Sequence, residues 1–391
     1  MRLLLLLLLA APLAAQDIPA VGTEQTLDVA TWNIERFGDA GGPSDAGQFA
    51  NALAVIRAAE IDLWALQEMN DEDDFEALVD SLGDGWEGEW RRGGPLGYGF
   101  IYKTDIISPL LDLVILDEFS FAFASRPPLL LLANVTLPDT TVRGLHFIDI
   151  HAKCCSDQPS YNRRLDASGA LKDYLDEEIL ADGDKAIILG DLNDELRSSI
   201  TPGEVSPYQN FRDDGDNYRF LTEVLDLANV PTFCSNQSCT SGSTLDHILL
   251  TREVESDYQD RSLSRFDEVL EEIPNYTSTT SDHVPVYARF DFAPVVSTEN
   301  ETAPTAFALR APFPNPFREA TTLAYDLPAA ATVQLEVFDA LGRRVATLGQ
   351  GPRSAGTHEV TFAPVRLVPG LYLVRLTADG QTATRRLVHA R

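Results

Sequence analysis

A short apolar segment that ends in polar residues constrains the fold more than any other part of the chain. Residues 186–189 (Ala-Ile-Ile-Leu) are followed directly by Gly190, Asp191, Leu192 and Asn193. Four consecutive apolar residues predict a strand that is buried on both faces, with other layers packed on either side. Asp191 and Asn193 can project from the strand end into one small space, which suits a hydrated metal ion and a phosphate group. A simple turn is the alternative, because Gly, Asp and Asn are common turn residues.

Several other predicted strands also end in polar residues. Hydrophobic periodicity predicts strands over residues 26–33, 61–67, 100–102, 129–136, 142–151, 245–251 and 284–292, and helices over 45–60, 75–82 and 159–179. A glycine-rich loop is predicted over residues 93–99. Strands and helices do not alternate strictly, and residues 129–151 are predicted to form a hairpin. The expected fold is therefore α/β, with two mixed sheets packed together and helices outside.

The residues at these strand ends are of the types that phosphoester hydrolysis needs. Asn33, Glu68 and Asp282 offer oxygen ligands, which suit Mg²⁺ or Mn²⁺, with Ca²⁺ as a further option. Asp246 beside His283 can orient the imidazole and raise its basicity.

Asp191 can align or deprotonate a water molecule for in-line attack on phosphorus. Each residue alone has a structural explanation: His151 as a core histidine, Asp282-His283 as a turn cap, Glu68 as a solvated side chain. Their joint occurrence at strand ends favours a catalytic site.

The two ends of the chain indicate export. Met1-Arg2, the run Leu3–Leu9 and the small residues after it predict a signal peptide over residues 1–15. No later segment has the length and apolar character of a transmembrane helix, and a monomer is expected. Residues 293–309 lack periodicity and are predicted to be a linker. Beyond it, strict alternation in residues 333–338 and 371–376 predicts a small all-β sandwich over residues 310–391.

Four cysteines in an exported chain favour disulfides, and three connectivities are open. One combines Cys234–Cys239 with a strained vicinal Cys154–Cys155 bond, and the others pair the two clusters with each other. A metal site is less favoured, because no histidine shows zinc-type spacing.

Six motifs occur in order and resemble the endonuclease/exonuclease/phosphatase superfamily. They are Thr31-Trp32-Asn33-Ile34, Leu66-Gln67-Glu68, Ile150-His151, Gly190-Asp191-Leu192-Asn193-Asp194, Leu245-Asp246-His247-Ile248-Leu249 and Ser281-Asp282-His283-Val284-Pro285. The resemblance covers residues 26–292 and implies a four-layer α/β/β/α sandwich with a divalent-metal phosphodiesterase site.

The resemblance also implies a role for each residue. Glu68 would be the chief metal ligand, aided by Asn33 and Asp282. Asp191 and Asn193 would handle the water and the phosphate or leaving group. His151, and His283 held by Asp246, would be the acid–base or phosphate-stabilising histidines. Tyr98 and Arg126 occupy positions where deoxyribonuclease-like members contact the substrate backbone.

The C-terminal region resembles the sorting domain of the type IX secretion system. The matching motifs are Phe313-Pro314-Asn315-Pro316-Phe317, Leu341-Gly342-Arg343-Arg344-Val345-Ala346, Gly356-Thr357-His358 and Pro369-Gly370-Leu371-Tyr372. The resemblance implies recognition by the type IX machinery and passage through the periplasm and outer membrane. The tail would then be removed, and the protein released or attached to the surface. An accessory β-domain that binds a partner is the alternative.

The leading functional hypothesis is a secreted nuclease acting on DNA or RNA. Lys153 and the pair Arg163-Arg164 put positive charge near the site, although the chain carries a net charge of −30. From Arg310 onward there are ten arginines and six acidic residues, so the acidic excess lies before the tail. Such a surface repels polyanions unless salt screens it.

Two alternatives stay open. One is a phosphoesterase of sphingomyelinase or sugar-phosphate type, and the other is a catalytically dead surface-binding protein. The strict alternation of residues 119–123 (Phe-Ser-Phe-Ala-Phe) predicts a half-buried strand rather than a membrane-inserting hairpin. It therefore gives the lipid hypothesis little support.

Overall fold

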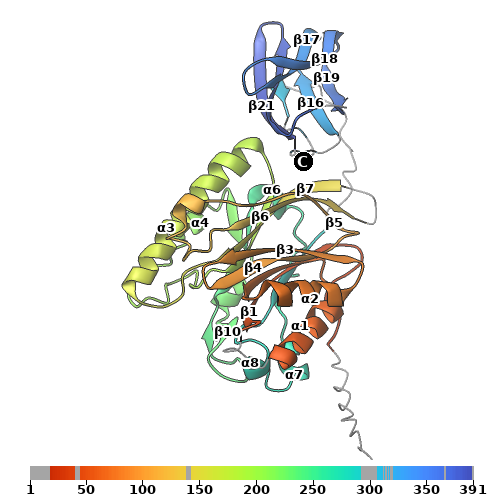
Figure 1. The fold of residues 1–391 in the computed structure, drawn as a ribbon. Coiled ribbons are helices and arrows are strands. Elements are labelled where there is room, and N and C mark those ends of the chain that lie inside the picture. The colour runs from red at the N-terminus through yellow and green to blue at the C-terminus, as the bar shows by residue number, and fades with distance from the viewer. Residues whose placement is uncertain are drawn as a thin grey trace, which may run out of the picture.

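The structure, a computed structural model, describes residues 18–39, 45–137, 142–291 and, with short gaps, 306–389. The predicted signal peptide and most of the predicted linker lie outside these residues. A larger α/β unit is followed along the chain by a smaller all-β unit (Figure 1). None of the helices in the described ranges is long and apolar enough to cross a membrane.

Two six-stranded mixed sheets form the centre of the larger unit. In the first sheet the strand order is β13-β14-β1-β2-β4-β3, and β1 and β2 run parallel. In the second the order is β5-β6-β7-β8-β12-β9, and β7 and β8 run parallel. The strands of the first sheet are β1 (Leu27–Phe37), β2 (Leu63–Met69), β3 (Trp86–Gly93), β4 (Leu96–Lys103), β13 (Ser264–Arg265) and β14 (Val286–Phe290). Those of the second are β5 (Ile107–Val114), β6 (Leu129–Thr136), β7 (Val142–His151), β8 (Ala186–Asp191), β9 (Tyr218–Phe220) and β12 (Asp246–Thr251).

Helices cover the outer faces of both sheets (Figure 1), and a two-stranded ribbon forms a third, small sheet that is bridged to the segment before β14 through Phe233 and His283. The longer helices are α1 (Asp45–Ala59), α2 (Glu72–Leu82) and α3 (Gln158–Tyr174), which continues as a π-helical turn (Leu175–Ile179) and a 3₁₀ turn (Leu180–Asp182). The shorter helices are α4 (Gln209–Arg212), α5 (Glu223–Leu227), α6 (Arg252–Glu255), α7 (Glu268–Glu272) and α8 (Tyr276–Thr279), and the ribbon is β10 (Phe233–Cys234) with β11 (Gly242–Ser243). Aspartates cap α2 and α3: the Asp71 side chain accepts from the Asp74 amide and that of Asp157 from the Ser160 amide.

Three apolar clusters separate the four layers and confirm the predicted α/β/β/α sandwich. The central cluster fills the space between the sheets, a second packs α1 and α2 on the first sheet, and a third packs α3 on the second sheet. The apolar run of β8 is continuous because both faces of the strand are buried. Ile187 and Leu189 belong to the central cluster, whereas Ile188 packs on the α3 side. The strand is thus buried on both faces, as predicted.

Two local predictions were wrong. The predicted glycine-rich loop is largely a β-hairpin, because β3 and β4 pair up to Gly93 and Leu96. A Cβ on Gly97 would lie 1.9 Å from the Met69 carbonyl oxygen, so this glycine permits close backbone approach within a strand. The run Phe119–Phe123 is not a strand but a 3₁₀ turn (Asp117–Phe119) followed by further turns. Phe123 is buried, whereas Phe121 is 75% exposed.

The C-terminal unit is the predicted all-β sandwich. Its two sheets have the strand orders β15-β16-β19 and β18-β17-β20-β21, with an apolar cluster between them. The strands are β15 (Ala308–Leu309), β16 (Thr321–Leu327), β17 (Ala331–Asp339), β18 (Arg344–Arg353), β19 (Gly356–Phe362), β20 (Gly370–Ala378) and β21 (Gln381–His389). Because Ala308 and Leu309 pair with β16, the last two residues of the predicted linker belong to this unit.

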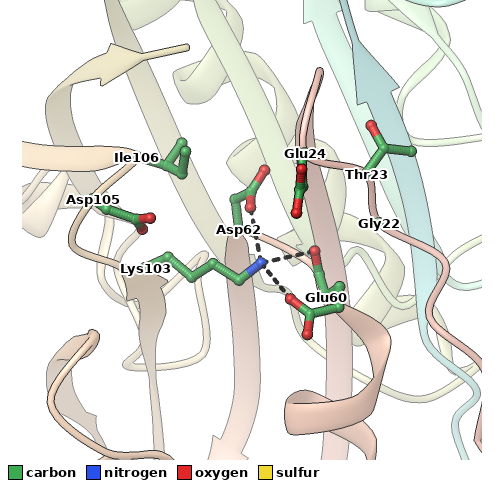
Figure 2. Close-up of a pocket in the computed structure, with 8 residues that line it drawn as sticks. All are labelled: Gly22, Thr23, Glu24, Glu60, Asp62, Lys103, Asp105 and Ile106. Carbon is green, nitrogen blue, oxygen red and sulfur yellow. Dashed lines mark hydrogen bonds and ion pairs between the residues drawn. The ribbon is translucent and has the colours of Figure 1, made fainter. Parts of the chain in front are cut away.

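A pocket near the start of β2 holds none of the predicted site residues (Figure 2). The Lys103 ammonium group lies within it, 3.1 Å from a Glu60 carboxylate oxygen and 3.2 Å from one of Asp62. The acidic groups nearest this ammonium are therefore partly neutralised within the protein. The chemistry expected from the sequence belongs to the opposite end of β1 and β2.

Replacing Gly190 tests how tightly the end of β8 is packed. Gly190 has φ +149°, and a Cβ there would lie 1.9 Å from the Ile150 carbonyl oxygen. We expect Gly190→Ala to lower the free energy of unfolding by about 1–3 kcal/mol, as overpacking does. Urea unfolding followed by tryptophan fluorescence measures this change in the larger unit. All four tryptophans lie before residue 91, so the signal comes from the unit that contains Gly190. Gly169→Ala, in open space on α3, is the matched control and should not destabilise the protein.

Candidate active site

The predicted strand ends meet at one edge of the sandwich. The C-terminal ends of β1 and β2 from the first sheet face those of β7 and β8 from the second. The start of β12 and the loop before β14 reach the same edge, since both strands run antiparallel to their neighbours. A pocket there is lined by seven predicted residues: Glu68, Arg126, His151, Asp191, Asn193, Asp282 and His283. Asn33 and Asp246 lie just behind them, fully buried.

The Asp191 carboxylate lies at the centre of this group. Its Oδ2 accepts hydrogen bonds from the side-chain amides of Asn33, at 3.0 Å, and Asn193, at 2.9 Å. Asn193 adopts φ +52°, a conformation that asparagine tolerates, and its backbone amide donates to Asp191 Oδ1 at 2.9 Å. Burial, above all, raises the pKa of Asp191 to about 7. This carboxyl group can therefore exchange a proton near neutral pH.

His283 is held by Asp246 in the manner expected. The ring nitrogen Nδ1 lies 2.8 Å from Asp246 Oδ2, and Nε2 points to the pocket, 4.0 Å from Asp191 Oδ2. The Phe233 ring packs at a centroid distance of 5.2 Å from the imidazole. Burial alone would lower the pKa of His283, but the carboxylates of Asp246, Asp191 and Asp282 together raise it well above the usual range. His283 is therefore an imidazolium at neutral pH.

His151 has the opposite protonation preference. Its Nε2 lies 3.7 Å from both Glu68 Oε1 and Asp191 Oδ2. Burial, with Arg126 and His283 nearby, lowers the pKa of His151 well below the usual range. One neutral and one charged histidine therefore flank Asp191, and such a separation of pKa values is how a site assigns acid and base roles.

A group of carboxylates forms the other wall. Glu68 has φ +61°, a strained conformation that is typical of functional positions, and its Oε1 accepts from the Asn33 amide at 3.3 Å. The Asp282 backbone amide donates to Glu35 Oε2 at 3.2 Å. Burial, then the neighbouring Asp282, raises the pKa of Glu35 to about 7. The crowding of Glu35, Glu68 and Asp282 leaves negative charge that a bound cation would offset.

The two residues carried over from deoxyribonuclease-like relatives lie differently. Arg126 lines the pocket, while its Nε and Nη2 donate to the carbonyls of His151 and Ala152 at 3.0 and 2.9 Å. Tyr98 is 1% exposed, and its hydroxyl donates to the Pro127 carbonyl. In this position Tyr98 supports the segment that carries Arg126, and direct substrate contact by Tyr98 stays a prediction.

Among the pocket residues that were not assigned a role from the sequence, three lie beside the predicted catalytic groups: Glu35, Arg36 and Phe233. Glu35 lies two positions after Asn33, on the same face of the strand by alternation; the sequence places it at this strand end, and the structure adds it to the pocket. Arg36 also lines the pocket, and its amide donates to Glu68 Oε2 at 3.0 Å. Phe233 comes from β10, whose two residues are too few for a periodicity signal.

The chain belongs to the endonuclease/exonuclease/phosphatase family, whose model matches residues 30–283. Membership makes it a phosphoric ester hydrolase by class. Residues 311–390 match the model of the secretion system C-terminal sorting domain, which indicates type IX export to the cell surface or beyond. No curated protein matches the chain significantly in sequence.

Solved structures support the fold assignment. The humanized TDP2 of D. rerio is 14% identical, with a TM-score of 0.51, over 68% of this chain and 99% of that one. The 3′ phosphatase NExo from Neisseria, bound to a product DNA hairpin, is 18% identical with a TM-score of 0.51, over 68% of this chain and 100% of that one. At these identities the likeness concerns the fold.

Removing the charge of Asp246 tests its control of His283. Asp246→Asn removes the carboxylate that does most to raise the pKa of His283 against the effect of burial. The pKa of His283 should therefore fall below its value in the wild-type protein. NMR titration of the histidine side chains in metal-free buffer measures the change. His146, whose pKa burial lowers to about 4, is an internal control that should not move. An unchanged His283 titration would contradict the pairing.

Proposed function

We propose that the protein is an exported, divalent-metal-dependent phosphodiesterase that hydrolyses nucleic acid by attack of water on phosphorus. One observation carries the proposal: Asp191 Oδ2 lies 3.7 Å from His151 Nε2 and 4.0 Å from His283 Nε2, and the pKa of the first histidine is lowered while that of the second is raised. A base for the water and a cation for the phosphate are thereby available within one pocket.

Two groups of side chains could hold the metal ion. Asp191, Asp246 and His283 have candidate ligand atoms within 4.8 Å of one another. Their atoms are largely engaged, however, because Asp246 binds His283 and Asp191 accepts from two amides. We therefore favour Glu68, Asp282 and Asn33, as the sequence predicted, with Glu35 beside them.

The chemistry of this second group fits a hard divalent cation. Asn33 Oδ1 is buried and has no hydrogen-bond partner among the described residues, although a carboxamide oxygen there needs one. Oxygen ligands of this kind favour Mg²⁺, Mn²⁺ or Ca²⁺ over zinc. When bound, the ion would offset the carboxylate charge and polarise a phosphoryl oxygen.

The protonation state of each side chain decides its role in the reaction. Asp191 takes the proton from the attacking water, which Asn193 helps to position. The His283 imidazolium, kept charged by Asp246, donates to a phosphoryl oxygen and stabilises the negative charge that develops there. His151 is neutral and hydrogen-bonds the phosphate or the leaving oxygen. Arg126 adds positive charge from a buried position beside the pocket, and Arg36 lies at the pocket with its guanidinium paired to Asp39.

A phospholipid phosphodiesterase is the second candidate, and the exposed aromatic turn favours it. Phe119 is 42% and Phe121 75% exposed, and this turn leads directly to Arg126 at the pocket. The expectation of a half-buried strand had removed this support, and the turn restores it. A lipid headgroup would bring its phosphodiester to the same catalytic groups.

The first activity experiment compares substrates with and without divalent metal. Protein freed of metal by EDTA is supplied with Mg²⁺, Mn²⁺ or Ca²⁺ and incubated with plasmid DNA, RNA, sphingomyelin and a chromogenic phosphodiester. We expect metal-dependent loss of nucleic acid and no turnover in EDTA. Cleavage of sphingomyelin alone would select the lipid candidate. No turnover of any substrate with any of the three ions would contradict the enzyme assignment.

Substitutions in the pocket test the assigned roles. We expect His283→Ala and Glu68→Ala each to lower kcat by about 10²–10⁴-fold, the usual contribution of a general acid–base or charge-stabilising group. Circular dichroism and urea unfolding check that both variants fold. Asp105→Asn, in the pocket of Figure 2, is the matched control and should retain activity. A fully active His283→Ala enzyme would refute the site assignment.

A further inference from the structure

Two adjacent cysteines lie at the rim of the catalytic pocket. Cys154 and Cys155 both line it, both are exposed, and neither is in a disulfide. Their sulfur atoms are 2.8 Å apart. Cys234 and Cys239 are bonded to each other, so pairing between the two clusters is excluded and the rim cysteines have only one another as partners within the chain.

Hydrogen bonds from a buried arginine fix the backbone around these cysteines. The buried Arg164 donates through Nη1 to the carbonyls of Lys153 and Cys155, both at 2.8 Å, and through Nε to Asp194 at 2.8 Å. Cys155 has φ +86°, which a non-glycine residue adopts only when its surroundings impose it. The fold thus keeps the two thiols close to each other.

A lysine beside the thiols favours reaction at one of them. Lys153 Nζ lies 3.2 Å from Cys154 Sγ and 3.8 Å from Cys155 Sγ. An ammonium group stabilises a thiolate, which is the nucleophilic form of cysteine. The hydrogen bond between the two sulfurs raises the pKa of Cys155. Cys154 is therefore the attacking sulfur and Cys155 the resolving one.

We propose that Cys154 and Cys155 form a redox modification site that closes to a vicinal disulfide. Closure removes the thiol contacts of Lys153 Nζ and leaves it only the Cys154 carbonyl oxygen at 3.1 Å, so that Lys153 can bind a phosphate of the substrate. The oxidant is a small-molecule disulfide. The Cys154 thiolate attacks one of its sulfurs and expels a thiolate, which leaves a mixed disulfide on Cys154. Cys155 then loses its proton and attacks Cys154 Sγ, expelling the second thiolate. Two protein thiols are oxidised, and one small disulfide is reduced to two thiols.

Such a bond would be reversible. Neighbouring Cα atoms are about 3.8 Å apart, less than the separation that a relaxed disulfide spans, so the bond is easily reduced. Export to an oxidising compartment favours the closed form. Cys234 and Cys239 are 7% and 1% exposed, which protects their bond under the same conditions.

A count of free thiols tests whether the Cys154–Cys155 disulfide forms, and it does not depend on enzyme activity. The full chain is equilibrated with mixtures of reduced and oxidised glutathione, alkylated with N-ethylmaleimide, and analysed by peptide mass spectrometry. We expect the peptide with both rim cysteines to lose two hydrogens and to resist alkylation in oxidising mixtures. Cys154→Ser should not form this product. Two rim thiols that stay alkylatable, or that carry only glutathione, would overturn the proposal.

The link to Lys153 rests on the proposed function and has its own readout. With the phosphodiester polymer that the enzyme cleaves, at low salt, KM should be about two- to five-fold lower in the oxidised form with kcat unchanged, the size expected of one exposed ion pair. Cys154→Ser should show one KM in both buffers. Equal KM values for the two wild-type forms would overturn the role of Lys153. If no substrate is cleaved, the proposed function fails, while the thiol count still decides whether the bond forms.

Discussion

A hydrogen bond from the Asn33 amide to the Asp191 carboxylate connects the two sheets where their strands end. Deeper in the sandwich, Gln67 of the first sheet donates to Asp149 of the second at 2.6 Å. Both acidic side chains are buried, and the cluster that fills the rest of the space between the sheets is apolar. A buried polar group that loses its partner is costly, so the sheets cannot slide past each other without breaking these bonds. The packing of the whole sandwich therefore sets the spacing of groups in the pocket.

The layered fold could be predicted because its signals are local. The apolar run of β8 and the polar residues that follow it describe a strand between two layers, and the structure places Ile187 and Ile188 on opposite faces of it. The errors arose where a tertiary contact overrides the local pattern. Gly97 lies in a strand that another backbone approaches closely. Phe121 alternates with the small residues Ser120 and Ala122, yet it lies in an exposed turn with Arg163 over its ring at 4.3 Å. Neither neighbour is visible in a window of sequence.

The candidate site was predictable in composition but not in its electrostatics. Residue types at strand ends were enough to bring Glu68, Asp191 and His283 to one pocket. The opposite protonation states of the two histidines depend on what else is buried beside each ring, which no spacing rule contains. Glu35 was visible at the end of β1 but received no role, because its raised pKa depends on burial and on the neighbouring Asp282. Residue identity thus predicts the class of chemistry, and burial decides the role of each group.

Arg126 and Arg164 hold the rim of the pocket by its main-chain carbonyls, from His151 to Cys155. Every amino acid supplies a main-chain carbonyl, so these hydrogen bonds do not depend on which side chains occupy residues 152–155. Substitutions there can alter what the entrance recognises while the loop keeps its path and the catalytic groups keep their positions. The scaffold separates the part of the molecule that must stay constant from a part that evolution can vary, and new substrate preferences can arise at the rim one substitution at a time.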